Sequence, residues 1–264
     1  MNPIYYQSFS ATENPVTQLL FIHGWGMNSG IWTDLIPRLS AQLPDYEFTV
    51  VDLPGYGKSP AMVQESTSLS LAEALRPLVK AKLRKKNIIL GWSMGGLIAI
   101  ELASIFTEHI HQLVLVSATP RFVQADNWSE AVEAKLFLQF LDSLEKDHSA
   151  TLKRFLAIQA LGSPTAKQDI KQIQQQLSQQ GGAKPSALRQ GLQILLNEDK
   201  RIQLLALNIP VICIAGQRDT LIKVKALELL TETPNIYLHT MAAAGHAPFI
   251  SHPQQFVELL LKAL

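Results

Sequence analysis

Short apolar runs rich in β-branched residues alternate with longer amphipathic stretches over the first 120 residues of the chain. The apolar runs predict four strands, at 19–22, 48–51, 88–90 and 113–116. Helical spacing between them predicts three helices, at 31–39, 70–83 and 97–106. Strands that are apolar throughout and are joined by helices predict a parallel sheet with helices covering both of its faces.

The alternation stops after residue 120 and returns at about residue 201. Between these points we expect no strand, and amphipathic spacing predicts four helices, at 131–144, 150–161, 167–180 and 186–196. The alternation resumes with strands at 211–215 and 236–238 and helices at 224–230 and 253–264. We therefore expect residues 1–120 and 201–264 to form one α/β core, with residues 121–200 inserted as a helical lid. The glutamine-rich stretch 172–177 is expected to be a solvated helix face.

Composition narrows the function classes. Lys and Arg together number 23 against 22 Asp and Glu, which gives no electrostatic argument for nucleic acid or a membrane surface. The first eight residues lack the basic and apolar regions of a signal peptide, and no apolar run is long enough to span a bilayer. We expect a cytoplasmic, soluble protein. The one cysteine, Cys213, lies in an apolar run and is expected to fill the core.

The pentapeptide 91–95, Gly-Trp-Ser-Met-Gly, lies between a predicted strand and a helix of small residues. A Gly-x-Ser-x-Gly in this position is the sequence form of a nucleophile elbow. The turn is so sharp that a side chain at either glycine would collide with the neighbouring strand or helix. It strains the serine backbone and places the hydroxyl at the positive end of the following helix. We expect Ser93 to be a nucleophile rather than a solvated serine in a glycine turn.

A serine hydroxyl becomes a good nucleophile when a base removes its proton, and that base is normally a histidine oriented by a carboxylate. Asp219 follows the strand at 211–215, and His246 follows the strand at 236–238. Both loops should open at the carboxyl edge of the sheet, where the elbow also lies. We expect Ser93, Asp219 and His246 to form a triad. The remaining histidines are expected to be structural or surface residues: His23, His109, His111, His148, His239 and His252.

Attack on an ester creates an oxyanion that backbone N–H groups can stabilise. One donor is expected to be the amide of Met94, directly after the nucleophile, and the other the amide of Trp25 in the loop at 23–28. Because amides donate, the side chains of Trp25 and Met94 are free to shape the pocket floor. His23 is expected to order this loop, and the turn at 52–59 is expected to be structural.

With these motifs in this order, the chain resembles the α/β hydrolases and, among them, the pimeloyl-[acyl-carrier protein] methyl ester esterases of biotin synthesis. The similarity runs from about Ile4 to the last helix, through five segments: 23–28, 51–59, 90–97, 154–162 and 243–253. The lid segment from Arg154 to Gly162 distinguishes this family from most esterases. Met94 departs from the leucine that is more usual after the nucleophile, but its amide is retained.

The resemblance implies an α/β-hydrolase fold, a mostly parallel sheet with an inserted lid, and a Ser-His-Asp acyl-enzyme mechanism. The implied reaction converts the methyl ester of pimeloyl-[acyl-carrier protein] to pimeloyl-[acyl-carrier protein] and methanol, with no metal or organic cofactor. By position, Ser93 is the nucleophile, Asp219 the acid, and His246 the base and a substrate contact. Trp25 and Met94 match oxyanion and substrate-contact positions.

In the lid, the resemblance implies that one five-residue stretch lines the acyl channel: Phe155, Leu156, Ala157, Ile158 and Gln159. The substrate is attached to an acidic carrier protein, so basic lid residues should contact it, and Lys153 and Arg154 are the candidates. A mixed, solvated surface is the alternative for these two residues. We expect a monomer.

Other functions stay open because the same triad serves many acyl substrates. The alternatives are a general short-chain carboxylesterase and a carbon–carbon bond hydrolase. A dehalogenase is disfavoured because its nucleophile is a carboxylate and Ser93 is not. A binding module without turnover is disfavoured because the triad and both oxyanion loops are intact.

Overall fold

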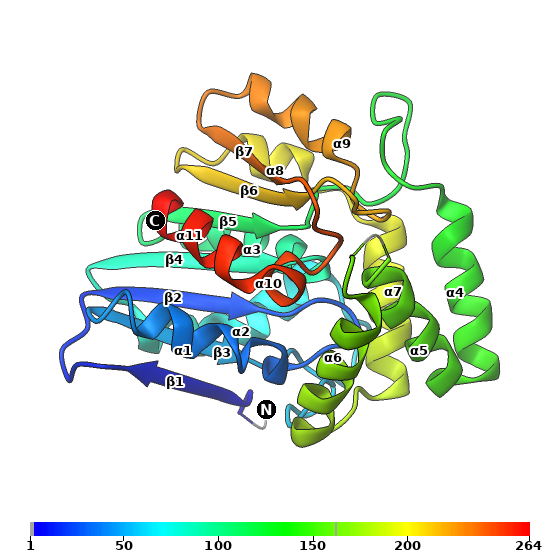
Figure 1. Cartoon of the computed structure of the whole chain (residues 1–264), viewed down its shortest axis with the longest axis horizontal. Helices are drawn as coiled ribbons and strands as arrows, with labels where there is room; N and C mark the ends of the chain where they lie inside the picture. Colours follow the sequence, from blue (N-terminus) through cyan, green and yellow to red (C-terminus); the bar gives the residue numbers. More distant parts are fainter. Residues whose placement is uncertain (1–2, 162) are drawn as a thin grey trace.

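The computed structural model describes residues 3–161 and 163–264, and its centre is a seven-stranded sheet (Figure 1). The strands, in spatial order, are β1 (Tyr6–Ser10), β3 (Tyr46–Val51), β2 (Thr17–Ile22), β4 (Lys86–Trp92), β5 (Gln112–Val116), β6 (Val211–Gly216) and β7 (Ile236–Met241). Only β1 is antiparallel to its neighbour among the described strands. The predicted mostly parallel sheet is therefore present.

Alternate side chains of the central strands pack into two separate hydrophobic cores, one on each face of the sheet. In β2, Leu20 and Ile22 pack with α2 (Ser68–Lys82) and α3 (Met94–Ile105). Leu19 and Phe21 point to the opposite core, which includes residues of α1 (Leu35–Ser40), α10 (Pro248–Ser251) and α11 (Pro253–Ala263). These three lie in front of the sheet in Figure 1.

The edge strands are less buried, and sequence reasoning missed one of them. All five residues of β1 are exposed, so no buried face leaves an apolar signal in its sequence. At the other edge, β7 continues three residues beyond the predicted run, through half-buried His239 and exposed Thr240 to buried Met241. Short helices α9 (Val224–Glu228) and η2 (Leu229–Glu232) join β6 to β7.

Of the helices between β5 and β6, all but the last lie beyond the carboxyl edge of the sheet (Figure 1). They are α4 (Ala134–Lys146), α5 (His148–Gln159), α6 (Ala166–Gln180) and α7 (Pro185–Asn197), followed by the unpredicted α8 (Arg201–Leu205). All four predicted lid helices are present within three residues of the expected bounds. The division of the chain into core and lid domains at 121 and 200 stays a prediction.

Helix α6 lies on the short helix η1 (Ser29–Trp32), and this contact corrects one expectation. Gln172 and Gln176 both donate hydrogen bonds to Asp34, at 2.7 and 2.8 Å, and Gln176 is buried. The glutamine-rich stretch is therefore not simply a solvated face, because two of its amides dock the helix onto the core.

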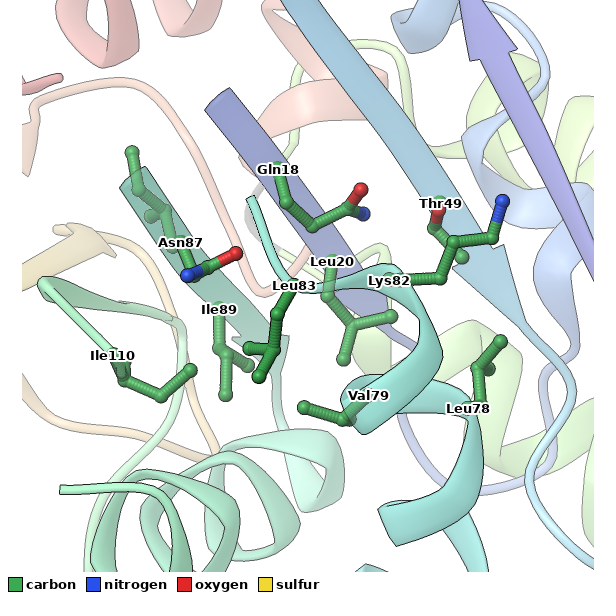
Figure 2. A pocket seen from close by; sticks show the side chains of 11 residues that line it. Gln18, Leu20, Thr49, Leu78, Val79, Lys82, Leu83, Asn87, Ile89 and Ile110 are labelled. Atoms are coloured by element: carbon green, nitrogen blue, oxygen red, sulfur yellow. The ribbon is translucent and has the colours of Figure 1, made fainter. Parts of the chain in front are cut away.

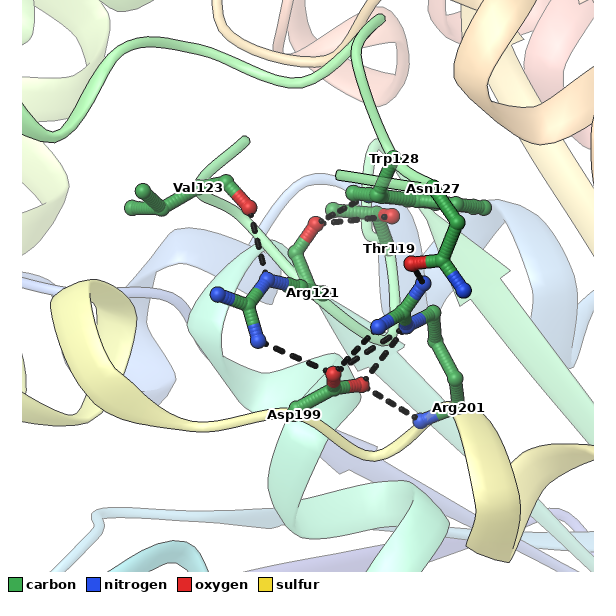
Figure 3. Close-up of polar contacts among 7 residues, drawn as sticks. All are labelled: Thr119, Arg121, Val123, Asn127, Trp128, Asp199 and Arg201. Carbon is green, nitrogen blue, oxygen red and sulfur yellow. Dashed lines mark hydrogen bonds and ion pairs between the residues drawn. The ribbon is translucent and has the colours of Figure 1, made fainter. Parts of the chain in front are cut away.

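The two ends of the lid segment meet in a polar cluster that we call the lid neck, formed by Arg121, Asp199 and Arg201 (Figure 3). Arg121 and Asp199 pair through their backbones and through a 2.9 Å ion pair. Arg201 pairs with the same carboxylate at 2.7 Å. Partial burial raises the pKa of Asp199, but the two guanidinium groups outweigh it and lower that pKa to about 2. The neck fixes where the chain leaves and rejoins the core.

A small enclosed cavity of about 20 Å³ lies between α2 and the starts of the central strands (Figure 2). It has room for about one water molecule. The Gln18 side chain lies at its wall, and neither of its amide atoms has a hydrogen-bond partner among the described residues. This cavity lies at the amino end of the strands, away from the elbow.

None of the helices in the described part of the chain combines the length and the apolar character required to span a bilayer. Cys213 is fully buried in β6, and burial raises the pKa of its thiol to about 12.

Candidate active site

Ser93 is the single residue between the end of β4 and the start of α3. Its backbone has φ 55° and ψ −124°, a region that costs a non-glycine residue free energy. The two glycines permit this turn. A Cβ on Gly91 would lie 2.5 Å from the Gly95 carbonyl oxygen, and a Cβ on Gly95 would lie 2.4 Å from the carbonyl oxygen of Ile22. The structure therefore has the strained elbow that the pentapeptide predicts.

The three predicted triad residues are hydrogen-bonded in series. His246 Nε2 lies 2.9 Å from Ser93 Oγ, and His246 Nδ1 lies 2.8 Å from Asp219 Oδ2. A carboxylate accepts, so Nδ1 carries the proton and Nε2 is left to accept from the serine hydroxyl. All three residues are buried, with Ser93 and His246 each 1% exposed. This arrangement can withdraw a proton from Ser93, and the catalytic role of the three residues stays a prediction.

Asp219 is held by the loop that carries it. Its Oδ1 accepts hydrogen bonds from the amides of Leu221 and Ile222, at 2.8 and 3.0 Å. The other carboxylate oxygen is thereby directed at His246. The acid and base loops also contact each other, because the Arg218 amide donates to the Ala244 carbonyl at 3.0 Å.

The loop after β2 passes close to the nucleophile. A Cβ on Gly24 would lie 3.0 Å from the Ser93 Cβ, so a larger residue there would press on the elbow. Among the residues that the structure describes, neither the Trp25 amide nor the Met94 amide donates a hydrogen bond to a protein acceptor. Two unpaired N–H groups beside a nucleophile are what an oxyanion hole requires.

His23 takes no part in the triad. Its Nε2 accepts from the Leu53 amide at 3.0 Å, so Nδ1 carries the proton and donates to the Gly24 carbonyl at 2.8 Å. Burial lowers the pKa of His23 and outweighs the opposing effect of Asp52. A neutral histidine thus links the loop after β2 to the loop after β3.

The structure brings only part of the predicted lid stretch to the site. Phe155 packs edge-to-face on Trp25, with ring centroids 4.6 Å apart. Leu156 and Gln159 are buried, Ile158 is half-buried, and Ala157 is exposed. A helix cannot direct five consecutive side chains into one channel, because successive residues are about 100° apart around its axis.

Gln159 has an unusual environment for an amide. It is 1% exposed, and neither of its side-chain polar atoms has a partner in the described part of the chain. Lys153 and Arg154 are exposed on the same helix, and the Arg154 guanidinium lies 5.4 Å from the Phe140 ring centroid. Gly162, the last residue of the resembling lid segment, lies outside the described residues.

Several contacts at the site were not predicted from the sequence. The Trp92 indole donates to the His246 carbonyl, the Trp25 indole to the Leu188 carbonyl, and the Tyr56 hydroxyl to the Ala187 carbonyl. Backbone acceptors carry no sequence signature. One sequence feature could have indicated the contact with the Trp25 loop: Gly191 lies inside a predicted helix, and a glycine there commonly marks the close approach of another segment.

Comparisons with known proteins identify the family. A family model described as the alpha/beta hydrolase fold matches residues 17–253. The chain belongs to this family. Two solved structures have similar folds: an esterase from Exiguobacterium antarcticum, 22% identical in sequence, and a bromoperoxidase from Bacillus anthracis, 23% identical. Each superposes on 98% of this chain with a TM-score of 0.87, and the match covers 94% of each solved chain. At this identity the likeness concerns the fold, and the predicted α/β-hydrolase fold is confirmed.

Curated relatives narrow the family further. A pimeloyl-[acyl-carrier protein] methyl ester esterase of Aeromonas hydrophila is 38% identical over 244 residues, which are 92% of this chain and 93% of that protein. One of the same name from Aliivibrio salmonicida is 37% identical over 254 residues, 96% and 94% of the two chains. This α/β hydrolase therefore belongs to the same family as these esterases, as its motifs predicted.

Proposed function

We propose that this α/β hydrolase is a serine carboxylesterase that hydrolyses the methyl ester of pimeloyl-[acyl-carrier protein] in biotin biosynthesis. The observation that carries the proposal is the buried Ser93–His246–Asp219 series, in a chain whose relatives over more than 90% of its length are named for this reaction. The family establishes the class of enzyme, and the site supplies a mechanism for it.

In the first half-reaction, Ser93 Oγ attacks the carbonyl carbon of the methyl ester while His246 Nε2 takes the hydroxyl proton. The carbonyl oxygen becomes an oxyanion, which accepts hydrogen bonds from the amides of Trp25 and Met94. The tetrahedral intermediate then breaks its bond to the methoxy oxygen. That oxygen leaves as methanol with the proton from His246, and the acyl group stays on Ser93.

In the second half-reaction, water replaces methanol. His246 takes a proton from water, the hydroxide oxygen bonds to the acyl carbon, and Ser93 leaves with the proton that His246 returns. The product is the free carboxylate. Asp219 keeps its charge throughout and stabilises the imidazolium that forms in each half. No step requires a metal or an organic cofactor.

The lid supports a carrier-bound, mostly apolar substrate. Phe155 and Leu156 offer apolar surface for the acyl chain, and the unpaired amide of Gln159 offers a hydrogen bond to a polar group of the substrate. Exposed Lys153 and Arg154 supply positive charge for an acidic carrier protein. We further propose that the enzyme works as a monomer in the cytoplasm, where a carrier-bound intermediate would be available, and gel filtration would test the oligomeric state.

The test is hydrolysis of pimeloyl-[acyl-carrier protein] methyl ester by the wild type and by Ser93→Ala, with a free short ester in parallel. Ser104→Ala is the matched control, because Ser104 lies on α3 and its hydroxyl donates to the Ile100 carbonyl of the same helix, its one hydrogen bond among the described residues. Fast cleavage of the carrier-bound ester that Ser93→Ala abolishes and Ser104→Ala retains would support the proposal. Cleavage of the free ester alone would favour a general carboxylesterase, and undiminished cleavage by Ser93→Ala would exclude the mechanism.

A further inference from the structure

Helix α7 lies directly against the loop that carries Trp25. The Trp25 indole Nε1 donates to the Leu188 carbonyl at 2.7 Å, and the Tyr56 hydroxyl donates to the neighbouring Ala187 carbonyl at 3.0 Å. Both aromatic side chains are buried, at 0% and 1% exposure, so water cannot replace these hydrogen bonds. The lid and the core are therefore joined at this point by specific polar contacts as well as by apolar packing.

Gly191, one turn further along α7, makes this approach possible. A Cβ at this position would lie 2.5 Å from Trp25 Cδ1, 2.6 Å from the Tyr56 hydroxyl oxygen and 3.0 Å from Met94 Sδ. A glycine inside a helix costs about 1 kcal/mol relative to alanine, so its presence requires a compensating contact. Here the compensation is contact with Trp25 and Met94, the two residues whose amides face the oxyanion in the proposed mechanism.

Trp25 lies in a glycine-rich loop. Gly24 and Gly26 flank it, and Gly26 has φ 75°, a conformation that other residues rarely adopt. A segment between two glycines has wide conformational freedom. The Trp25 amide shares a peptide plane with the Gly24 carbonyl, which accepts hydrogen bonds from His23 Nδ1 at 2.8 Å and from the Met27 amide at 3.3 Å. These bonds orient the plane within the loop, and the buried Trp25 side chain anchors the loop relative to the elbow. That side chain is held between Phe155 on α5, with ring centroids 4.6 Å apart, and the Leu188 carbonyl with Gly191 on α7.

We propose that α7 is a positioning element for the oxyanion hole: the Leu188 carbonyl and the bare Cα of Gly191 fix the Trp25 indole and, through it, the Trp25 amide. The inference rests on the proposed function. It adds that the lid acts on the chemical step itself, even for esters too small to contact the lid. Gly191 is a positioning residue, because it acts through Trp25.

The experiment measures kcat and KM for p-nitrophenyl acetate, whose acyl group has only two carbons. Gly191→Ala should displace the indole and lower kcat on the order of tenfold, less than the full loss of an oxyanion donor, with KM little changed. Gly182→Ala is the matched control, because Gly182 lies in the lid and a Cβ there meets nothing within 4 Å. The pH profile of kcat should keep its shape, because the triad contacts are not altered.

Trp25→Phe is a second variant that leaves α7 unchanged. It removes the indole donor and keeps an aromatic ring against Phe155, so kcat should again fall with KM little changed. The double variant should lose less than the product of the two single effects, because both disturb one interaction. Thermal unfolding of each variant shows whether the fold is kept. If Gly191→Ala does not fold, the comparison of Trp25→Phe with the wild type decides the test.

Wild-type kcat in both single variants would overturn the inference. So would an unchanged kcat for p-nitrophenyl acetate with a raised KM for the carrier-bound ester, because the lid would then only bind substrate. If the wild type shows no Ser93-dependent hydrolysis of any ester, the proposed function fails and the inference fails with it. If the wild type is active and the variants keep its kcat, the inference about α7 is wrong and the proposed function still stands.

Discussion

The indole Nε1 of Trp92 donates a 2.9 Å hydrogen bond to the carbonyl oxygen of His246. The residue directly before the predicted nucleophile therefore holds the backbone of the predicted base. The elbow and the histidine loop are distant in the sequence, because Ser93 and His246 are 153 residues apart. This contact fixes their separation without using any side-chain atom of the triad.

Trp92→Phe tests the importance of that contact. The smaller ring can still pack against Phe249, whose centroid now lies 5.1 Å away, but the buried His246 carbonyl loses its donor. We expect the free energy of unfolding to fall by about 1–3 kcal/mol and kcat by about tenfold, because the base is less well placed. Urea unfolding and steady-state kinetics measure the two effects.

Trp128→Phe is the matched control, because the Trp128 indole makes an equivalent 2.9 Å bond to the Arg121 carbonyl at the lid neck. It should lose stability and keep kcat. Equal kcat losses in the two variants would mean that general destabilisation, rather than the position of His246, explains the result.

Asp219→Asn should keep the fold and disable the base. The amide oxygen can still accept from Leu221 and Ile222, but the amide nitrogen cannot accept from His246 Nδ1, so the wrong tautomer is favoured. We expect kcat to fall on the order of 10³- to 10⁴-fold. Asp126→Asn, at an exposed position of the lid segment, is the control. A small loss for Asp219→Asn would show that another group orients the histidine.

Much of the fold could be predicted because the central strands are buried on both faces and are therefore apolar throughout. Strand β1 was missed because all of its residues are exposed. Helix α3 begins at Met94, three residues before the predicted start, because Gly95 and Gly96 add no side chain to the apolar helical pattern. Their lack of side chains lets the helix pack closely: a Cβ on Gly96 would lie 2.5 Å from the Ala118 Cβ.

The site also has features that the sequence predicts and features that it does not. Ser93, Asp219 and His246 could be predicted because the chemistry demands those side chains in that chain order after particular strands. The contacts of α7 could not, because their acceptors are the carbonyls of Ala187 and Leu188, which any residue would supply. The sequence of a helical segment also does not show which of its side chains point into the protein. Ala157 belongs to the lid stretch that resembles the family, and it is nevertheless exposed.

His23 makes the stability of the fold depend on pH. Burial lowers its pKa below the ordinary 6.5, so the folded chain keeps it neutral while the unfolded chain binds a proton below that pH. Its contribution to stability is present above about pH 6.5 and is lost as the pH falls toward the lowered folded-state value. His23→Gln can still accept from the Leu53 amide and has no proton to gain.

We therefore expect the free energy of unfolding of His23→Gln to fall less steeply than that of the wild type as the pH decreases below about 6.5. Urea titrations at several pH values measure this slope, which is independent of any constant loss of stability. His148→Gln, at an exposed position on α5, should follow the wild type. Parallel curves for wild type and His23→Gln would mean that His23 takes up its proton at the same pH in the folded and the unfolded chain.

Lys153→Glu tests whether the lid surface receives the carrier protein. Lys153 is exposed on α5, the helix that also presents Phe155 to Trp25, so a carrier bound there would lie near the acyl site. Reversing the charge should raise KM for pimeloyl-[acyl-carrier protein] methyl ester by about three- to tenfold at low salt, and added salt should reduce the difference. Hydrolysis of p-nitrophenyl acetate should not change.

Lys225→Glu is the matched control. It makes the same charge change on α9, outside the lid, and should leave the hydrolysis of both substrates unchanged. Equal effects of the two substitutions would assign the change to net charge and exclude a docking role for Lys153.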